Sequence, residues 1–156
     1  MLRDIDTMIR QTNETALEID IQTALAGDSP IVAAIRYEFP SALAIYAFGS
    51  QLNATANAGS DLDLAVLVAG YADTIQLWDL SGKLADISGC PVDLLDMRAA
   101  STVMQFQILQ TGRRLWGQEP QAGLFECFVL SEKTALDSAR GPLLNDIQTR
   151  GSVYGR

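Results

Sequence analysis

Two carboxylates stand at the head of an apolar run, and this pattern constrains the fold more than any other in the chain. Residues 64–68 are continuously apolar and directly follow Asp61-Leu62-Asp63. A short apolar run of this kind is typical of a strand buried in a sheet. Residues two apart in a strand point to the same face, so the carboxylates of Asp61 and Asp63 lie side by side, roughly 7 Å apart along the backbone. Together they are suited to hold a divalent cation.

A second predicted strand, residues 42–48, runs directly into Gly49-Ser50. A Gly-Ser turn that leaves a strand presents backbone N–H groups to a phosphate. Gly49 lets the backbone approach a nucleotide closely, and Ser50 offers its N–H and hydroxyl to the phosphates. A carboxylate clamp facing a phosphate cradle indicates Mg²⁺-dependent transfer on a nucleotide.

The order of these motifs resembles the nucleotidyltransferase superfamily of the DNA polymerase β type. The pattern of that superfamily is Gly-Ser, about ten residues, Asp-x-Asp, and a third carboxylate on a later strand. The third acid here is Asp93, in the predicted strand 92–96. The resemblance implies a small mixed sheet flanked by helices and three metal-binding, catalytic carboxylates, Asp61, Asp63 and Asp93.

Within that superfamily the chain is similar to the minimal nucleotidyltransferase antitoxins that accompany HEPN ribonuclease toxins. The similarity covers roughly residues 42–116, although Asn53 stands where many members carry a basic residue. It implies transfer of AMP from ATP to a tyrosine hydroxyl of a cognate HEPN toxin, with Mg²⁺ as cofactor. It also implies a hetero-oligomer with that toxin.

The remaining site residues have assigned roles. Asp93 completes the metal set and accepts the proton of the attacking hydroxyl. Asp96 competes for that role, but it lies three residues away and points to the opposite face, which favours a strand-end cap or surface acid. Ser60 belongs with the nucleotide-binding group, where it supports the turn before Asp61. Arg113 and Arg114 are interpreted as solvated, with phosphate or partner binding as the alternative.

Composition excludes several other classes of function. The chain has 156 residues, no histidine and a net charge of −8, with a pI near 4.3. The lack of histidine removes the commonest general base and most zinc sites. The acidic charge disfavours direct nucleic-acid binding and favours a basic protein partner. No apolar stretch approaches the ~20 residues of a membrane span, and the start does not resemble a secretory signal, so we expect a cytoplasmic protein.

The alternation of predicted elements indicates an α/β (α+β) fold in one nucleotidyltransferase domain, residues 1–120. Asp28-Ser29-Pro30 predicts a helix start before residue 31, and Gly89 and Gly112 predict helix ends. We expect Leu77, Leu80, Leu84 and Ile87 to pack on the sheet, with Trp78 beside them. The predicted helices span residues 14–26, 31–37, 71–88 and 102–111, and the predicted strands span 42–48, 61–68 and 92–96.

Residues 121–156 form a predicted helical C-terminal arm with apolar positions at helical spacing. We expect Gly141-Pro142 to break or kink it. Two interpretations remain open, a helix that covers the sheet and an arm that binds a partner.

Three functional hypotheses are considered, and the first two rest on the family resemblance. The leading hypothesis is the protein adenylyltransferase antitoxin. The first alternative is an antitoxin that neutralises the toxin by binding alone, with Asp61, Asp63 and Asp93 vestigial or sensing a nucleotide. The second is an enzyme that adenylylates small molecules such as aminoglycosides, which is disfavoured because a core of about 75 residues leaves little chain for an acceptor domain.

Overall fold

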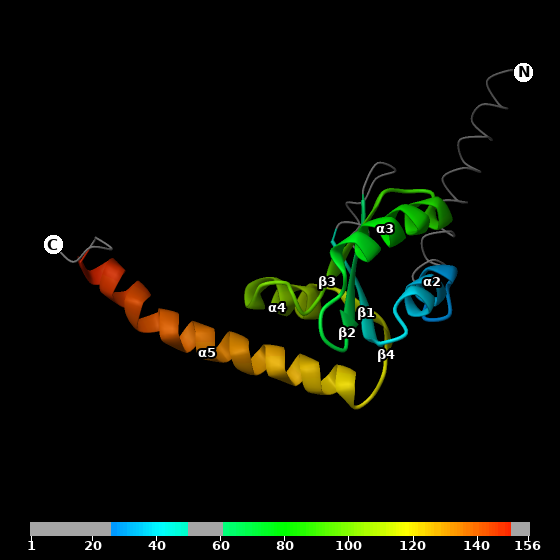
Figure 1. Cartoon of the computed structure of the whole chain (residues 1–156). Coiled ribbons are helices and arrows are strands. Elements are labelled where there is room, and N and C mark those ends of the chain that lie inside the picture. Colours follow the sequence, from blue (N-terminus) through cyan, green and yellow to red (C-terminus); the bar gives the residue numbers. More distant parts are fainter. Residues whose placement is uncertain (1–25, 50–60, 151–156) are drawn as a thin grey trace, which may run out of the picture.

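The computed structural model describes residues 26–49 and 61–150, with side chains to Gly141. The elements are α2 (Pro30–Glu38), β1 (Ala42–Phe48), β2 (Leu62–Val68), α3 (Thr74–Ser88), β3 (Val92–Asp96), α4 (Thr102–Thr111), β4 (Arg113–Gly117) and α5 (Gln121–Arg150). The strands form one sheet in the order β3-β2-β1-β4. β1 is antiparallel to β2 and β4, whereas β2 and β3 are parallel. The predicted mixed sheet flanked by helices is confirmed (Figure 1).

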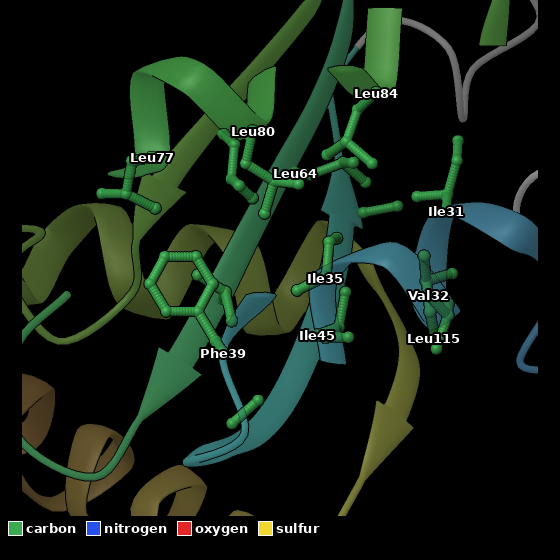
Figure 2. Packing of buried hydrophobic residues seen from close by; sticks show 14 of the residues in the cluster. Ile31, Val32, Ile35, Phe39, Ile45, Leu64, Leu77, Leu80, Leu84 and Leu115 are labelled. Carbon is green, nitrogen blue, oxygen red and sulfur yellow. The ribbon is translucent and has the colours of Figure 1, made fainter. Parts of the chain in front are cut away.

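One face of the sheet, which we call the support face, packs against α2 and α3. Leu77, Leu80 and Leu84 of α3 lie in one buried cluster with Leu64 of β2 (Figure 2). α2 contributes fully buried isoleucines at positions 31 and 35, which lie in the same cluster. Long aliphatic side chains from both layers therefore fill this half of the core.

The other face, which we call the working face, is covered by α4 and the first turns of α5. Its cluster includes the small residues Ala44 and Ala65 of the sheet and Phe125 and Val129 of α5. Beyond these turns α5 continues away from the sheet (Figure 1). The two interpretations of residues 121–156 therefore concern different parts of α5. The start of α5 covers the sheet, and the rest extends outward.

Local signals explain the helix ends that the sequence predicts. The Ser29 hydroxyl accepts a hydrogen bond from the Val32 N–H, and Pro30 occupies the first turn of α2. At the end of α3, Gly89 has φ +74°, a left-handed conformation that glycine adopts without steric cost. The predicted strands 42–48 and 92–96 match β1 and β3. The helix expected over residues 14–26 lies outside the described residues.

The structure adds one strand and overturns one predicted helix break. Residues 113–117 form strand β4, which the sequence analysis does not predict, and β4 pairs with β1. The expected break at Gly141-Pro142 does not occur, because α5 spans both residues as one helix.

One prediction about packing is also wrong. Ile87 is 44% exposed and Trp78 is 80% exposed, so neither packs on the sheet with Leu77, Leu80 and Leu84. The predicted helix end at Gly112 is confirmed, and Gly112 is extended rather than left-handed. A Cβ there would lie 2.5 Å from the Ile108 carbonyl oxygen and 2.6 Å from that of Ala47. Close backbone packing therefore explains this glycine.

None of the helices in the described part of the chain combines the length and apolar character needed to cross a membrane.

Candidate active site

Asp63 lies where three strands meet. Its antiparallel partner on β1 is Phe48, and its parallel partner on β3 is Asp93. Directly paired residues on adjacent strands point to the same face, so Asp63 and Asp93 project together. The working face is the one they share, because Asp63 has the strand parity of Ala65 and Leu67, which pack there. Asp61, two residues earlier, has the same parity, so three carboxylates gather at this end of the sheet.

The closeness of Gly49 to Asp63 explains why residue 49 is a glycine. Its φ is +84°, and a Cβ built there would collide with Oδ2 of Asp63. Any other residue would both strain the backbone and displace this carboxylate. The close approach seen at Gly49 is therefore to the Asp63 carboxylate, and its predicted contact with a nucleotide stays a prediction.

The electrostatics of Asp63 differ from those of an ordinary surface acid. Burial, reinforced by repulsion from Asp93 and then Asp61, raises the pKa of the Asp63 carboxyl above its usual value. Asp63 is half-buried, whereas Asp61 and Asp93 are exposed at the mouth of the site. A bound cation would relieve this repulsion, so the donor set fits a hard divalent ion such as Mg²⁺.

The metal and nucleotide assignments stay predictions. Among the described residues, no three or more His, Cys, Asp or Glu side chains are already arranged as a metal site. The assignment of Asp61, Asp63 and Asp93 therefore rests on strand register and charge. Ser50 and Ser60, predicted to bind the nucleotide, lie outside the described residues, as does Asn53.

Asp96 has a structural role, as the sequence analysis favours. Its carboxylate accepts hydrogen bonds from the backbone N–H groups of Ala72 (2.9 Å) and Arg98 (3.0 Å), and the residue is buried. These bonds tie the end of β3 to the segment before α3. Asp96 has the parity of Leu94, which packs on the support face, so it points away from Asp93.

A cavity of about 360 Å³ adjoins the carboxylates. It is lined by Phe48, Gly49 and Asp63 on the strand side, and by Met104, Gln107, Ile108 and Thr111 of α4. The sequence analysis assigns no role to these α4 residues, and only the position of α4 over the working face brings them to the site. The exposed Gln107 amide offers both a donor and an acceptor at this wall.

A second cavity, of about 510 Å³, lies between α4, α5 and the sheet and shares Ile108 with the first. At its wall the buried Tyr46 hydroxyl donates a hydrogen bond to Glu126 Oε1 (2.9 Å). Arg114 Nη1 lies 2.8 Å from Glu119 Oε1 and 3.4 Å from Glu126 Oε1. Burial, and next the Glu126 charge, raise the pKa of Tyr46. Arg114 is therefore exposed, as its interpretation as a solvated residue predicts, and it is also ion-paired within the chain.

Comparisons with known proteins agree with this geometry. The family model described as polymerase beta, nucleotidyltransferase matches residues 31–121. The protein adenylyltransferase MntA of Shewanella oneidensis is 36% identical over 120 residues, which are 77% of this chain and 86% of MntA.

Solved structures match at similar levels. A chain of a toxin–antitoxin crystal structure with AMP-PNP has 36% identity and a TM-score of 0.67, over 76% of this chain and 95% of that one. A chain of the structure of a tri-AMPylated Shewanella oneidensis HEPN toxin in complex with MNT antitoxin has 31% identity and a TM-score of 0.65, over 85% and 98%. The chain therefore belongs to the polymerase β nucleotidyltransferase family, in the branch that includes the protein adenylyltransferase MntA, as its resemblance predicts.

Proposed function

We propose that the chain is a Mg²⁺-dependent protein adenylyltransferase that moves AMP from ATP to a tyrosine hydroxyl of a cognate HEPN ribonuclease and thereby neutralises it as an antitoxin. The observation that carries this proposal is the register of Asp63 opposite Asp93, with Gly49 packed against it. One relative is named a protein adenylyltransferase, and a similar structure holds a tri-AMPylated HEPN toxin with its antitoxin. Both support a protein acceptor. An ATP-dependent enzyme of this kind would work in the cytoplasm.

Each residue of the site has its own role in the proposed reaction. Asp61 and Asp63 would hold Mg²⁺, which when bound neutralises phosphate charge and lowers the pKa of the attacking hydroxyl. The acceptor oxygen forms a bond to the α-phosphorus, pyrophosphate leaves, and Asp93 takes the hydroxyl proton. Gly49 and Ser50 hold the phosphates, with Ser60 supporting the turn before Asp61.

The decisive test follows labelled ATP in the presence of the HEPN protein. We expect the wild-type chain to increase the mass of this partner by AMP units, and EDTA to stop the reaction. The double substitution Asp61→Asn with Asp63→Asn should lower the rate by about a thousandfold or more, because it removes charge stabilisation of the transition state. Retained transfer by a folded double variant would contradict the assignment.

An antitoxin that works by binding alone is the alternative, and exposed apolar side chains on α5 are compatible with both functions. Leu124 is 65% exposed and Phe128 is 57% exposed, one helical turn apart. If binding alone neutralises the toxin, the double Asn variant would still silence the ribonuclease without any mass gain.

We also propose that α5 holds the partner protein in either case. Truncation after Pro120 is a poor test, because it would remove Ala122, Phe125 and Val129 from the core. The pair Leu124→Ser with Phe128→Ser keeps the full chain and removes only exposed apolar surface. We expect it to weaken binding of the HEPN protein about tenfold or more, with ATP affinity retained. Unchanged affinity for the toxin would refute this role of α5.

A further inference from the structure

The outer edge of β3 is a strand edge beside the catalytic end of the sheet. Within the described residues β3 is the last strand in the sheet order. The Pro91 carbonyl accepts from the Leu62 N–H (2.8 Å), and the Met97 N–H donates to the Val66 carbonyl (2.9 Å), so the odd-numbered positions face β2. Backbone direction alternates along a strand, which leaves the N–H and C=O groups of Val92, Leu94 and Asp96 facing outward. Such an edge is a template for an additional strand.

Two hollows flank this edge. The first, of about 310 Å³, lies between the small residues Ser81, Gly82 and Ala85 of α3 and the start of β3 at Pro91 and Val92. The second, of about 540 Å³, lies between the start of α3 and the end of β3, and both Leu95 and Asp96 line it. Consecutive strand residues point to opposite faces, so one hollow that touches both lies at the margin of the sheet.

Trp78 belongs to the lining of the first hollow, and it is 80% exposed. A tryptophan beside a recess is the kind of anchor that dominates protein interfaces. Val92 and Asp96 lie about 13 Å apart along an extended strand. The two hollows are therefore spaced to receive side chains about four residues apart on an added strand.

Charge indicates the chemistry of the partner. Asp79 and Asp86 are exposed and seven residues apart, so they project from the same side of α3. Lys83, which lies between them in the sequence, is paired with Glu38 of α2 at 3.8 Å. Together with the net charge of −8 on the whole chain, these exposed acids of α3 favour a basic partner over a second copy of the acidic chain.

We infer that the outer edge of β3 binds an extended segment of the acceptor protein as an additional strand, with apolar side chains in the two hollows and basic groups near Asp79 and Asp86. Val92 lines the first hollow, and the next residue is Asp93. In a segment paired with β3, a hydroxyl on the residue that lies beside Asp93 is therefore brought to the carboxylate end of the sheet. This inference rests on the proposed function, and it names how the acceptor reaches the site.

The first test measures AMP transfer against acceptor concentration. Trp78→Ala removes the exposed anchor, and Gly82→Gln fills the first hollow at a position with open space around a Cβ. We expect each variant to raise the half-saturating concentration of the acceptor about tenfold, with Mg²⁺-ATP affinity unchanged. Tyr37→Ala is the matched control, because Tyr37 is 86% exposed on α2, and it should leave the value unchanged.

The second test reads the backbone directly by amide hydrogen exchange in the full-length chain. Adding the acceptor protein should slow exchange at Leu94 and Asp96, whose N–H groups face outward, more than at Asp93 and Leu95, whose N–H groups face β2. Protection confined to α5 would overturn the inference.

The outcomes separate the two proposals. A wild-type chain that transfers no AMP overturns both. Normal transfer and normal half-saturation in Trp78→Ala and Gly82→Gln overturn only the role of the edge. Dimerisation of the chain alone that Trp78→Ala abolishes would assign the edge to a second copy, and so would also overturn it.

Discussion

The two faces of the sheet differ in what their side chains are suited to do. The support face is filled by branched aliphatic side chains such as Ile31, Ile35 and Leu84, all fully buried. The working face carries small residues beneath its helices, and it buries polar groups such as the Tyr46 hydroxyl and the Gln105 amide. The cavities beside Asp63 and Tyr46 both lie on this second face.

This difference shows how one thin sheet can serve stability and chemistry at once. A face packed with long side chains tolerates little change of volume, because interiors are close-packed. Beside Asp63, which is half-buried, the working face instead holds a cavity lined by residues of β1, β2 and α4. We therefore expect substitutions of the fully buried aliphatic residues on the support face to change mainly stability, and substitutions of the carboxylates on the working face to change mainly activity.

The largest effect should come from Asp93→Asn. If Asp93 accepts the proton of the acceptor, turnover should fall by about a hundredfold to ten-thousandfold, with a smaller loss of nucleotide affinity. Single-turnover assays with labelled ATP measure both quantities.

Asp96→Asn is the matched control on the same strand. It should mainly lower stability, because the Asp96 carboxylate accepts the N–H groups of Ala72 and Arg98. The opposite ranking of the two variants in turnover would mean that the wrong carboxylate is assigned.

Leu84→Ala sharpens the comparison from the support face. Leu84 is fully buried, so the substitution should lower the free energy of unfolding by about 2–5 kcal/mol. Chemical denaturation measures this loss, and nucleotide affinity of the remaining folded protein should be unchanged. Ile87→Ala, at a 44% exposed position of the same helix, should cost much less. Equal costs would show that the support face is not the main source of stability.

Tyr46→Phe tests the polar contact that joins β1 to α5. Loss of the hydrogen bond to Glu126 should destabilise the fold by about 1 kcal/mol, because a partly buried carboxylate loses a donor. Thermal unfolding detects the change, and Tyr37→Phe at an exposed position supplies the baseline. A neutral result would indicate that Arg114 alone satisfies Glu126.

The smallest effect concerns the pH dependence of Asp63. Because its pKa in the folded state is raised above the ordinary value of 3.8, ionising Asp63 costs stability as the pH rises through that range. Without Mg²⁺, Asp63→Asn should therefore raise the free energy of unfolding at neutral pH by up to about 1 kcal/mol. The gain should vanish near pH 3, where the wild-type carboxyl is protonated in both states. A variant less stable than wild type at pH 7 would contradict this sign.

The part of the fold that the sequence predicts is the part with local signals. Ser29-Pro30 and Gly89 mark helix ends through their own backbone preferences, and the apolar runs of β1 and β2 are complete strands in themselves. The positions of Asp61 and Asp63 follow from strand period alone. Their approach to Asp93 follows once β2 and β3 are paired in parallel.

The parts that the sequence analysis misses depend on distant contacts. β4 is a short, partly charged segment, and it is a strand because it pairs with β1. Trp78 is of a residue type that usually packs in a core, but it lies on the side of α3 that faces away from Leu64. The α4 residues at the cavity, such as Gln107, carry no motif, so only the packed structure assigns them to the site.

The strand order has a consequence for how the protein is made. The strands that carry Asp63 and Asp93 end at residue 96, whereas β4 begins at residue 113 and α5 at residue 121. Chains are synthesised from the N-terminus and fold as they emerge. A nascent chain therefore displays its three carboxylates before Glu126 can bond Tyr46 and before Phe125 and Val129 can cover the sheet. We expect activity to appear only when α5 docks, so that interrupted translation yields acidic fragments without an active enzyme.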